Sequence, residues 1–331
     1  MTDHCEDWAR KIESGDRRAV ARAISAAEGN QASVIPLLKR IYPGSRRALV
    51  VGVTGAPGTG KSTLAGRLAA VYRGAGHKVG VLAVDPSSPF SGGALLGDRI
   101  RMQGLSGDEG IFIRSMATRG NWGGVAAATA DAVTILEAAG CQIVLVETVG
   151  AGQDETEISS LASITLLLLV PGLGDEIQAF KAGLMEIADV FVINKADRDG
   201  ADELEREVRT SMSFASELSA AARDEAWRTP VVKTCATTGE GVDEVHRAIE
   251  GFHSFARRTG LDAQRERMQA RARIVQITLR RLLHEPGIGP GNEALIAARI
   301  DQVRDRKTDP YSVAEELTAN LGPALKGSTI K

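Results

Sequence analysis

Cysteine and histidine are scarce in this chain, and their scarcity limits the chemistry it can carry. Its 331 residues include three cysteines and five histidines. The cysteines are scattered and form no C-x-x-C pair, and the histidines form no H-E-x-x-H pair. The sequence therefore argues against a disulfide framework and against a Cys/His zinc site, and it favours a reducing compartment.

Long apolar runs and charge of one sign are also lacking. Solid apolar runs such as Leu166–Val170 are far too short to cross a bilayer. The net charge of −2 gives no reason to expect a nucleic acid or an anionic membrane as partner. The first residues are rich in Asp, Glu and Arg, without the apolar stretch of a secretory signal. We therefore expect a cytoplasmic protein.

A glycine-rich stretch stands out against this background. Residues 55–63 fit the pattern G-x-x-x-x-G-K-[ST], between the apolar run 48–54 and a helical pattern from Leu64. Such a loop points backbone N–H groups at a phosphate, while Lys61 reaches the β and γ phosphates and Ser62 ligates Mg²⁺. The predicted phosphate-binding residues are Gly55, Ala56, Pro57, Gly58, Thr59, Gly60, Lys61, Ser62 and Thr63.

A second motif indicates which base is bound. The apolar run from Val190 ends in Asn194-Lys195-Ala196-Asp197, an N-K-x-D pattern. A carboxylate at Asp197 can accept hydrogen bonds from guanine N1–H and N2–H₂, whereas adenine offers no such donor pair. After the next predicted strand, Cys235, Ala236 and Thr237 are expected to line the base, with the Ala236 N–H meeting guanine O6. The sequence thus predicts GTP and GDP as ligands.

Acidic residues follow two further predicted strands. Asp85 and Glu147 both end apolar runs, and Asp98 lies in a long small-residue loop, 86–99. Because Mg²⁺ on a triphosphate takes only one or two carboxylates, these three residues are the candidate ligands beside Ser62. Gly150 could bind the γ-phosphate through its N–H and release it after hydrolysis. The segment 86–99 is the candidate first switch, 147–150 resembles a switch, and 171–178 is a candidate for a further mobile loop.

The hydrolysis chemistry leaves some roles open. Lys61, Mg²⁺ and the loop amides would neutralise charge while a water attacks in line. Asp85 either orients that water or acts only through Mg²⁺, and Glu147 completes the set of candidate catalytic residues. An arginine finger could be Arg99, Arg114 or Arg119, or could come from a partner.

Alternation of strand and helix patterns predicts an α/β fold with a doubly wound, mostly parallel sheet. The expected strands are 48–54, 78–84, 142–147, 164–170, 189–194 and 230–234. The expected helices between them are 61–74, 122–139, 176–187, 201–222 and 242–257.

The two ends of the chain differ from this core. Residues 1–45 predict an N-terminal helical extension that packs on the core as a cap, with a new helix starting at Asp16. Residues 46–260 form the expected P-loop domain. Residues 261–331 predict an Arg-rich helical arm, with further helices at 292–306 and 310–321. These helices are too few for a core of their own, and we interpret them as a dimerisation arm.

Several blocks together resemble one known family. They are G-A-P-G-T-G-K-S-T (55–63), V-D-P-S-S-P (84–89), R-S-M-A-T-R-G-N-W-G-G (114–124), V-E-T-V-G-A-G-Q (146–153), G-D-E-I-Q-A-F-K (174–181) and N-K-A-D (194–197). Over nearly its whole length the chain is similar to the MeaB G proteins, which include ArgK and human MMAA.

The resemblance implies a homodimeric P-loop GTPase that acts beside an adenosylcobalamin-dependent acyl-CoA mutase such as methylmalonyl-CoA mutase. There it would gate cofactor loading and help to remove damaged cofactor. The resemblance also implies a third switch at 174–181. Residues 89–91, 116–117 and 121–122 depart from the common family pattern, which favours a mutase other than methylmalonyl-CoA mutase.

Two other functions share the P-loop. A small-molecule kinase would use Lys61 in the same way, but it would need an acceptor pocket and would have no use for the N-K-x-D motif. A nickel metallochaperone of the same branch would need a Cys/His metal cluster, which the sequence does not supply.

Replacing the base-reading carboxylate tests the nucleotide assignment. We expect Asp197→Asn to weaken GTP binding by about tenfold or more, because the two guanine donors lose a charged acceptor. ATP binding should stay as weak as in the wild type. Titration of both proteins with fluorescent GTP and ATP analogues measures this, and equal wild-type affinity for GTP and ATP would refute the guanine assignment.

Overall fold

The computed structural model describes residues 2–29, 31, 33–86, 107–118, 124–148, 158–172, 184–218, 227–284 and 302. The chain divides into two compact units, Met1–Gln269 and Ala270–Lys331. Helix α12 (Leu261–His284) runs across this division, so its first two turns belong to the first unit. No helix in the described part of the chain has both the length and the apolar character of a membrane span.

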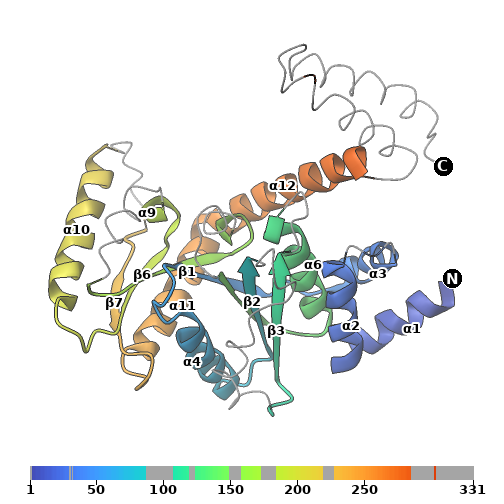
Figure 1. Ribbon diagram of the computed structural model, residues 1–331, viewed down its shortest axis with the longest axis horizontal. Helices are drawn as coiled ribbons and strands as arrows, with labels where there is room; N and C mark the ends of the chain where they lie inside the picture. The colour runs from blue at the N-terminus through green and yellow to red at the C-terminus, as the bar shows by residue number, and fades with distance from the viewer. Residues whose placement is uncertain are drawn as a thin grey trace. The chain divides into compact units, whose positions relative to one another are not determined.

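The first unit is built on a parallel sheet, which confirms the predicted α/β class (Figure 1). The described strands lie in the order β3-β2-β4-β1-β5-β6-β7, and every neighbouring pair is parallel. The strands are β1 (Leu49–Gly55), β2 (Val79–Pro86), β3 (Ile111–Thr118), β4 (Ile143–Thr148), β5 (Ile164–Leu169), β6 (Val190–Asn194) and β7 (Val231–Thr234).

Strand β1 lies at the point where the chain reverses its direction of travel across the sheet. After β1 the chain builds β2, β3 and β4 on one side, and then β5, β6 and β7 on the other. In open parallel sheets ligands bind at such a switch point, outside the carboxyl ends of the strands. The loop after β1 is therefore in the position that a ligand site requires.

Successive residues of a strand point to opposite faces of the sheet. Because most of the strands are continuous apolar runs, apolar side chains cover both faces. Val51 and Val53 pack with α4 (Lys61–Gly74) and α11 (Val242–Thr259) on one face. Val50 packs on the other face with the N-terminal helices and α6 (Gly124–Ala138). At the β5–β6 end this second face is covered by α9 (Leu184–Ile187) and α10 (Ala201–Leu218).

Six of the strands match the sequence prediction to within two residues at each end. Helices α4, α6, α10 and α11 also lie where they are predicted. The predicted helix 176–187 is described only from Leu184 onward, and the predicted helices 292–306 and 310–321 lie outside the described residues apart from Gln302. The switch segments 87–99 and 173–181 lie outside them as well.

Strand β3 is the element that the sequence analysis missed. It is the outermost strand in the described sheet and pairs with β2. Its apolar pattern is interrupted by Arg114 and Ser115, so it lacks the continuous apolar run of a central strand. Arg114 is accommodated because its guanidinium forms an ion pair with Glu28 and donates to Ser25 Oγ at 2.9 Å. Both partners are on α2 (Arg17–Glu28).

The N-terminal segment forms α1 (Thr2–Glu13), α2, α3 (Val34–Ile41) and the short 3₁₀ turn Tyr42–Gly44. The predicted helix start at Asp16 is confirmed, since its carboxylate caps α2 by accepting from the N–H groups of Arg18 and Ala19, each at 2.8 Å. The indole of Trp8 donates to Ala19 O at 3.1 Å and joins α1 to α2. Together with the core contacts, this makes the segment a cap on the sheet.

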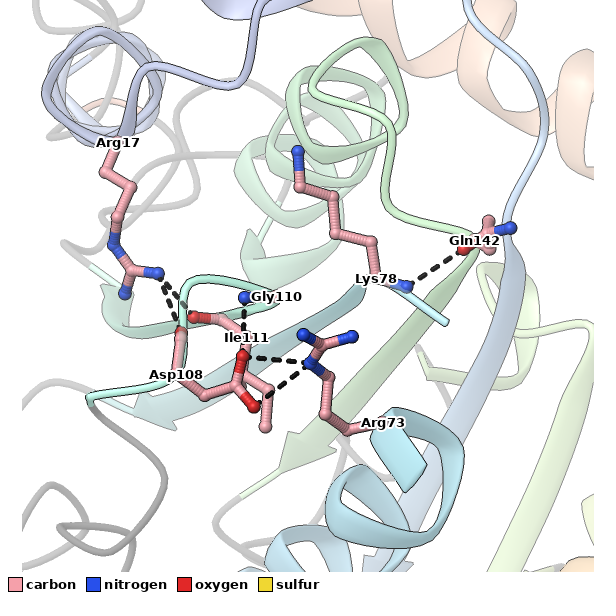
Figure 2. Close-up of polar contacts among 7 residues, drawn as sticks. All are labelled: Arg17, Arg73, Lys78, Asp108, Gly110, Ile111 and Gln142. Carbon is pink, nitrogen blue, oxygen red and sulfur yellow. Dashed lines mark hydrogen bonds and ion pairs between the residues drawn. The ribbon is translucent and has the colours of Figure 1, made fainter. Parts of the chain in front are cut away.

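The start of β3 carries a second attachment of this cap (Figure 2). Arg17 donates to Ile111 O at 2.7 Å and to Asp108 O at 3.2 Å. The Asp108 carboxylate accepts from Gly110 N at 2.7 Å and from Arg73 Nε at 2.9 Å, and these bonds hold its pKa below the usual value. Helix α2 is thus tied to β3 at two places, at the start of the strand through Arg17 and in its middle through Arg114.

Helix α12 is anchored on the amino edge of the sheet by a largely buried ion pair. Asp189, which is 5% exposed, precedes β6 and accepts from Thr165 N at 2.9 Å. Arg265 donates to both of its carboxylate oxygens, at 2.7 and 2.8 Å, and to Ser163 O at 2.9 Å. The same guanidinium lies 4.9 Å from the ring centre of Phe252. The beginning of α12 is therefore fixed to β5, β6 and α11.

Neutralising Asp189 tests this anchor. We expect Asp189→Asn to lower the free energy of unfolding by about 3 kcal/mol, because Arg265 keeps its charge in a largely buried place without a counter-ion. Urea titration followed by circular dichroism measures the change. Glu207→Gln, an exposed change on α10, is the control and should stay within about 0.5 kcal/mol of the wild type. A loss as small as the control's would show that the ion pair contributes little.

Candidate nucleotide site

The loop between β1 and α4 has the tight, glycine-dependent shape that the sequence predicts. Gly55, Gly58 and Gly60 have positive φ angles of 141°, 81° and 93°. A Cβ on Gly60 would lie 2.3 Å from Asn194 Nδ2, and one on Gly55 would lie 2.3 Å from Leu168 O. At these two positions a side chain is excluded both by the backbone angle and by its neighbours.

Lys61 is the first residue of α4, and its ammonium group lies in the loop that precedes it. Its Nζ donates to Gly55 O at 2.6 Å and to Ala56 O at 2.9 Å, and the residue is only 7% exposed. Beside it is the amino end of α4, where the partial positive charge of the helix favours an anion. A phosphate in this loop would therefore meet a buried cation and the end of a helix.

Asn194, the last residue of β6, joins this loop to the segment that follows β7. It is 2% exposed. Its Nδ2 donates to Thr59 O at 2.7 Å, and its Oδ1 accepts from Ala236 N at 3.0 Å and from Thr234 Oγ1 at 3.1 Å. The amide group thus uses both its donor and its acceptor ends to bridge two loops, each of which is far from it in sequence.

Lys195 strengthens the same bridge. It has a φ angle of 56°, an unusual value for a residue with a side chain. Its Nζ donates to Gly58 O at 2.7 Å. Consecutive residues of the N-K-x-D motif therefore hold consecutive carbonyl groups of the phosphate loop, and the strained backbone at Lys195 makes this possible.

A cavity of about 590 Å³ lies beside this bridge. It is lined by Asp197 and neighbouring residues at the start of α10, together with Thr234, Cys235 and Glu240. A purine fits such a volume, and Asp197 is the candidate acceptor for its donors. The predicted base-reading residues Asp197 and Cys235 are thus brought together in one cavity.

The Cys235 thiol has a pKa below its ordinary value. Hydrogen bonding with Thr237, whose Oγ1 is 3.3 Å from the sulfur, is the largest cause, and Thr238 adds to it. The nearby Asp197 side chain acts in the opposite direction. The Ala236 N–H, predicted to meet guanine O6, donates to Asn194 Oδ1 in this structure. Contact with O6 remains a prediction, in which this N–H would be shared or released.

The predicted metal-binding carboxylates come from β4, which pairs with β1, and from β2, which pairs with β4. Glu147 lies on β4, in register with Val53 of β1 and Ala83 of β2, and is 2% exposed. Asp85 is the last residue but one of β2, at the same edge of the sheet. Ser62 is the second residue of α4, one position after Lys61. Asp98 and Gly150 lie outside the described residues.

This donor set fits Mg²⁺ better than a transition metal. A hydroxyl and one or two carboxylates beside a phosphate loop are what Mg²⁺ uses in nucleotide sites, where phosphate and water supply its other ligands. In the described part of the chain, no group of three or more His, Cys, Asp and Glu side chains is placed to hold a metal ion.

Arg114, one of the candidate arginine fingers, bonds to the N-terminal cap in this structure. Its guanidinium forms the ion pair with Glu28 and the hydrogen bond to Ser25, so it holds α2 against β3. Arg99 and Arg119 lie outside the described residues. The roles of Thr59 O and Thr234 in fixing Asn194 were not predicted, because no residue pattern marks a backbone acceptor or a supporting hydroxyl.

Comparison with known proteins decides the family. The sequence matches the family described as "Methylmalonyl Co-A mutase-associated GTPase MeaB" over residues 18–287. The chain belongs to the MeaB family. GTPase ArgK of Escherichia coli is 36% identical over 261 residues, 76% of each chain. A relative from Pyrococcus abyssi is 44% identical over 318 residues, 96% of each chain. The MeaB family assignment makes this chain a GTPase that binds guanine nucleotides.

Two further proteins extend the comparison. The mouse protein "Methylmalonic aciduria type A homolog, mitochondrial" is 40% identical over 220 residues, 65% of this chain and 52% of that protein. The crystal structure of a protein named "LAO/AO transport system kinase" superposes with a TM-score of 0.66 at 27% identity, covering 96% of this chain and 98% of that one. The second match supports the fold described above.

The Asn194 bridge gives a direct test of the site. In Asn194→Asp an anionic oxygen replaces the Nδ2 donor and faces the carbonyl of Thr59, so the two loops should separate. We expect the Kd values for GTP and GDP to rise about tenfold or more, as measured by calorimetry. Gln142→Glu makes the same chemical change at the amino edge, where the side chain oxygen accepts from Lys78 N, and should leave both Kd values unchanged. Wild-type affinity in Asn194→Asp would contradict the bridging role.

Proposed function

We propose that this GTPase is a chaperone of an adenosylcobalamin-dependent acyl-CoA mutase, and that its nucleotide state gates cofactor loading and reactivation of that enzyme. The match to a mutase-associated GTPase family over residues 18–287 carries this proposal. The mouse relative, whose name refers to methylmalonic aciduria, agrees with it. All three cysteines are free thiols, which suits action in the reducing cytoplasm.

The nucleotide would lie across the Asn194 bridge. Its phosphates would occupy the loop 55–63, and its base the cavity beside Asp197. To bind the β and γ phosphates, the Lys61 ammonium would exchange a carbonyl partner, Gly55 O or Ala56 O, for phosphate oxygens. Because the bridge joins both loops, binding at either end would help to order the other.

Hydrolysis would use groups at the carboxyl edge of the sheet. Ser62, Glu147 and Asp85 would hold Mg²⁺, with Asp98 as a further candidate. When bound, Mg²⁺ supplies positive charge to the β and γ oxygens. Lys61 and the loop N–H groups would stabilise the charge of the transferring group. Asp85 would orient the attacking water, and the Gly150 N–H would report the γ-phosphate to the switch segments.

The homodimer belongs to this proposal as well. Among the described residues of the second unit, Ile274, Val275 and Ile277 on α12 are 65%, 49% and 46% exposed. Apolar side chains exposed together on a helix are typical of an interface. A second copy of this chain is the proposed partner of that helix.

A kinase function is the competing proposal, and the name of the structural neighbour, a transport system kinase, gives it some support. A kinase would need an acceptor hydroxyl or amine in place of water. The N-K-x-D motif is hydrogen-bonded to the phosphate loop, and this connection favours a GTP switch. A small-molecule kinase would have no use for the N-K-x-D motif. Phosphate release from GTP in the absence of any acceptor distinguishes the two.

The mutase role is tested by mixing purified proteins. We expect an adenosylcobalamin-dependent acyl-CoA mutase to increase the rate of GTP hydrolysis severalfold, and GTP to speed the exchange of damaged cofactor from that mutase. Lys61→Ala should lose about a hundredfold in GTP turnover while keeping the fold, because the buried cation that stabilises the transferring group is gone.

Lys39→Ala is the matched control, since Lys39 is an exposed lysine of α3. It should keep both activities. The chaperone role fails if none of a panel of acyl-CoA mutases changes the GTPase rate and no nucleotide changes mutase reactivation. In that outcome GTP hydrolysis by the protein alone would remain measurable. The GTPase activity and the chaperone role are therefore tested separately.

A further inference from the structure

Arg67 makes a connection that neither the sequence motifs nor the family assignment explains. It lies on α4, in the second turn after Lys61. Its Nε donates to Ala236 O at 3.1 Å and its Nη2 donates to Thr237 O at 2.5 Å. A Cβ on Gly239 would lie 4.0 Å from its Nη1. The guanidinium therefore lies along the segment 234–240, which begins with the last residue of β7 and which we term the base loop.

The side of the base loop that Arg67 contacts decides what it can do. The cavity beside Asp197 is lined on the base loop by Thr234, Cys235 and Glu240, and Arg67 is not among the described residues that line it. Arg67 binds the carbonyls of Ala236 and Thr237, whereas the N–H of Ala236 is directed to Asn194 Oδ1. Arg67 thus supports the base loop from behind and would not touch a bound base.

We propose that Arg67 is a positioning residue for guanine recognition, which fixes the base loop on the helix that begins at the phosphate site. The planar guanidinium offers donors at fixed angles, so its bonds to the carbonyls of Ala236 and Thr237 fix the two peptide groups on either side of Thr237. Both peptide groups follow Cys235 in the base loop. Asn194 holds the loop on the strand side, and Arg67 holds it on the helix side.

The position of Arg67 predicts an effect on nucleotide affinity and not on the rate of GTP hydrolysis. The hydrogen bonds of the Arg67 guanidinium go to the base loop, whereas Lys61 bonds to the phosphate loop. Loss of Arg67 should therefore loosen the base end of the site and leave the phosphate end in place. Affinity for GTP and GDP should fall together, the preference for GTP over ATP should shrink, and turnover at saturating GTP should be retained.

The test compares three variants on the same helix. In Arg67→Gln we expect Kd for GTP and GDP to rise roughly three- to tenfold, since the two lost bonds are charged but one is exposed and the other only partly buried. The GTP-to-ATP preference should fall by a similar factor, with kcat within about twofold of the wild type. A lysine can reach one carbonyl but cannot present a planar pair of donors. The Kd values and the GTP-to-ATP preference of Arg67→Lys should therefore lie between those of the wild type and those of Arg67→Gln.

Arg73→Gln is the matched control. Arg73 is also on α4, but its guanidinium contacts Asp108 at the amino edge of the sheet (Figure 2). This variant loses a charged contact of α4 without disturbing the base loop, so base preference should remain at the wild-type level. Thermal unfolding of all three variants separates a general loss of stability from a specific loss of base recognition.

The inference rests on the proposed guanine site, and the outcomes separate the two. If the wild type does not prefer GTP over ATP, the guanine site itself is refuted. If the wild type prefers GTP and Arg67→Gln keeps that preference, or if Arg73→Gln reduces it equally, the role of Arg67 is refuted. A fall in kcat with unchanged Kd would likewise overturn it.

Discussion

The nucleotide site depends on one buried side-chain amide. Asn194 donates to the phosphate loop at Thr59 and accepts from the segment after β7 at Ala236 and Thr234. A buried amide left without these partners would cost about 1–3 kcal/mol for each unmade bond, so the three segments hold one another in place. Each loop also has hydrogen bonds of its own, such as Lys61 Nζ to Gly55 O and Cys235 N to Glu240 O, and Asn194 joins the two loops to each other.

The parallel sheet explains why these segments can meet. Strands β1, β5 and β6 are neighbours, so their carboxyl ends deliver the phosphate loop and Asn194 to the same edge. The adjacent β7 delivers Thr234. Glu147 arrives from β4 on the other side of β1. Residues that are widely separated in the sequence thus form one site because the sheet orders them.

The opposite edge of the sheet has a different task. There Arg17, Arg73 and Asp108 attach the N-terminal cap and α4 to the start of β3, and Asp189 attaches α12 to the start of β6. These contacts are ion pairs and bonds to backbone carbonyls, which position elements of the fold. The contacts that attach these elements and the candidate ligand residues therefore lie at opposite ends of the same strands.

The sequence predicts most of this architecture, because buried parallel strands appear as continuous apolar runs and the phosphate loop has a fixed spacing. It also predicts Lys61, Asn194 and Asp197, whose side chains are required by the chemistry of the ligand. It does not predict β3, where Arg114 interrupts the apolar pattern and is neutralised by Glu28 on a distant helix. It does not predict Arg67 either, because an arginine on a helix surface is ordinary until the loop beside it is known.

The same limit applies to Asp85 and Glu147. The sequence pattern identifies an acidic residue at the end of a strand. For Glu147, only its 2% exposure in the structure distinguishes it from a solvated turn residue.

Strand β6 connects the anchor of α12 directly to the phosphate loop. It is five residues long, preceded by Asp189 and ended by Asn194, so about 16 Å of hydrogen-bonded strand separates the anchor of α12 from the bridge at the nucleotide. Both ends of this short rod carry buried polar bonds. A tilt of the first turns of α12 would therefore pull on the same backbone that holds the phosphate loop, without any hinge between them.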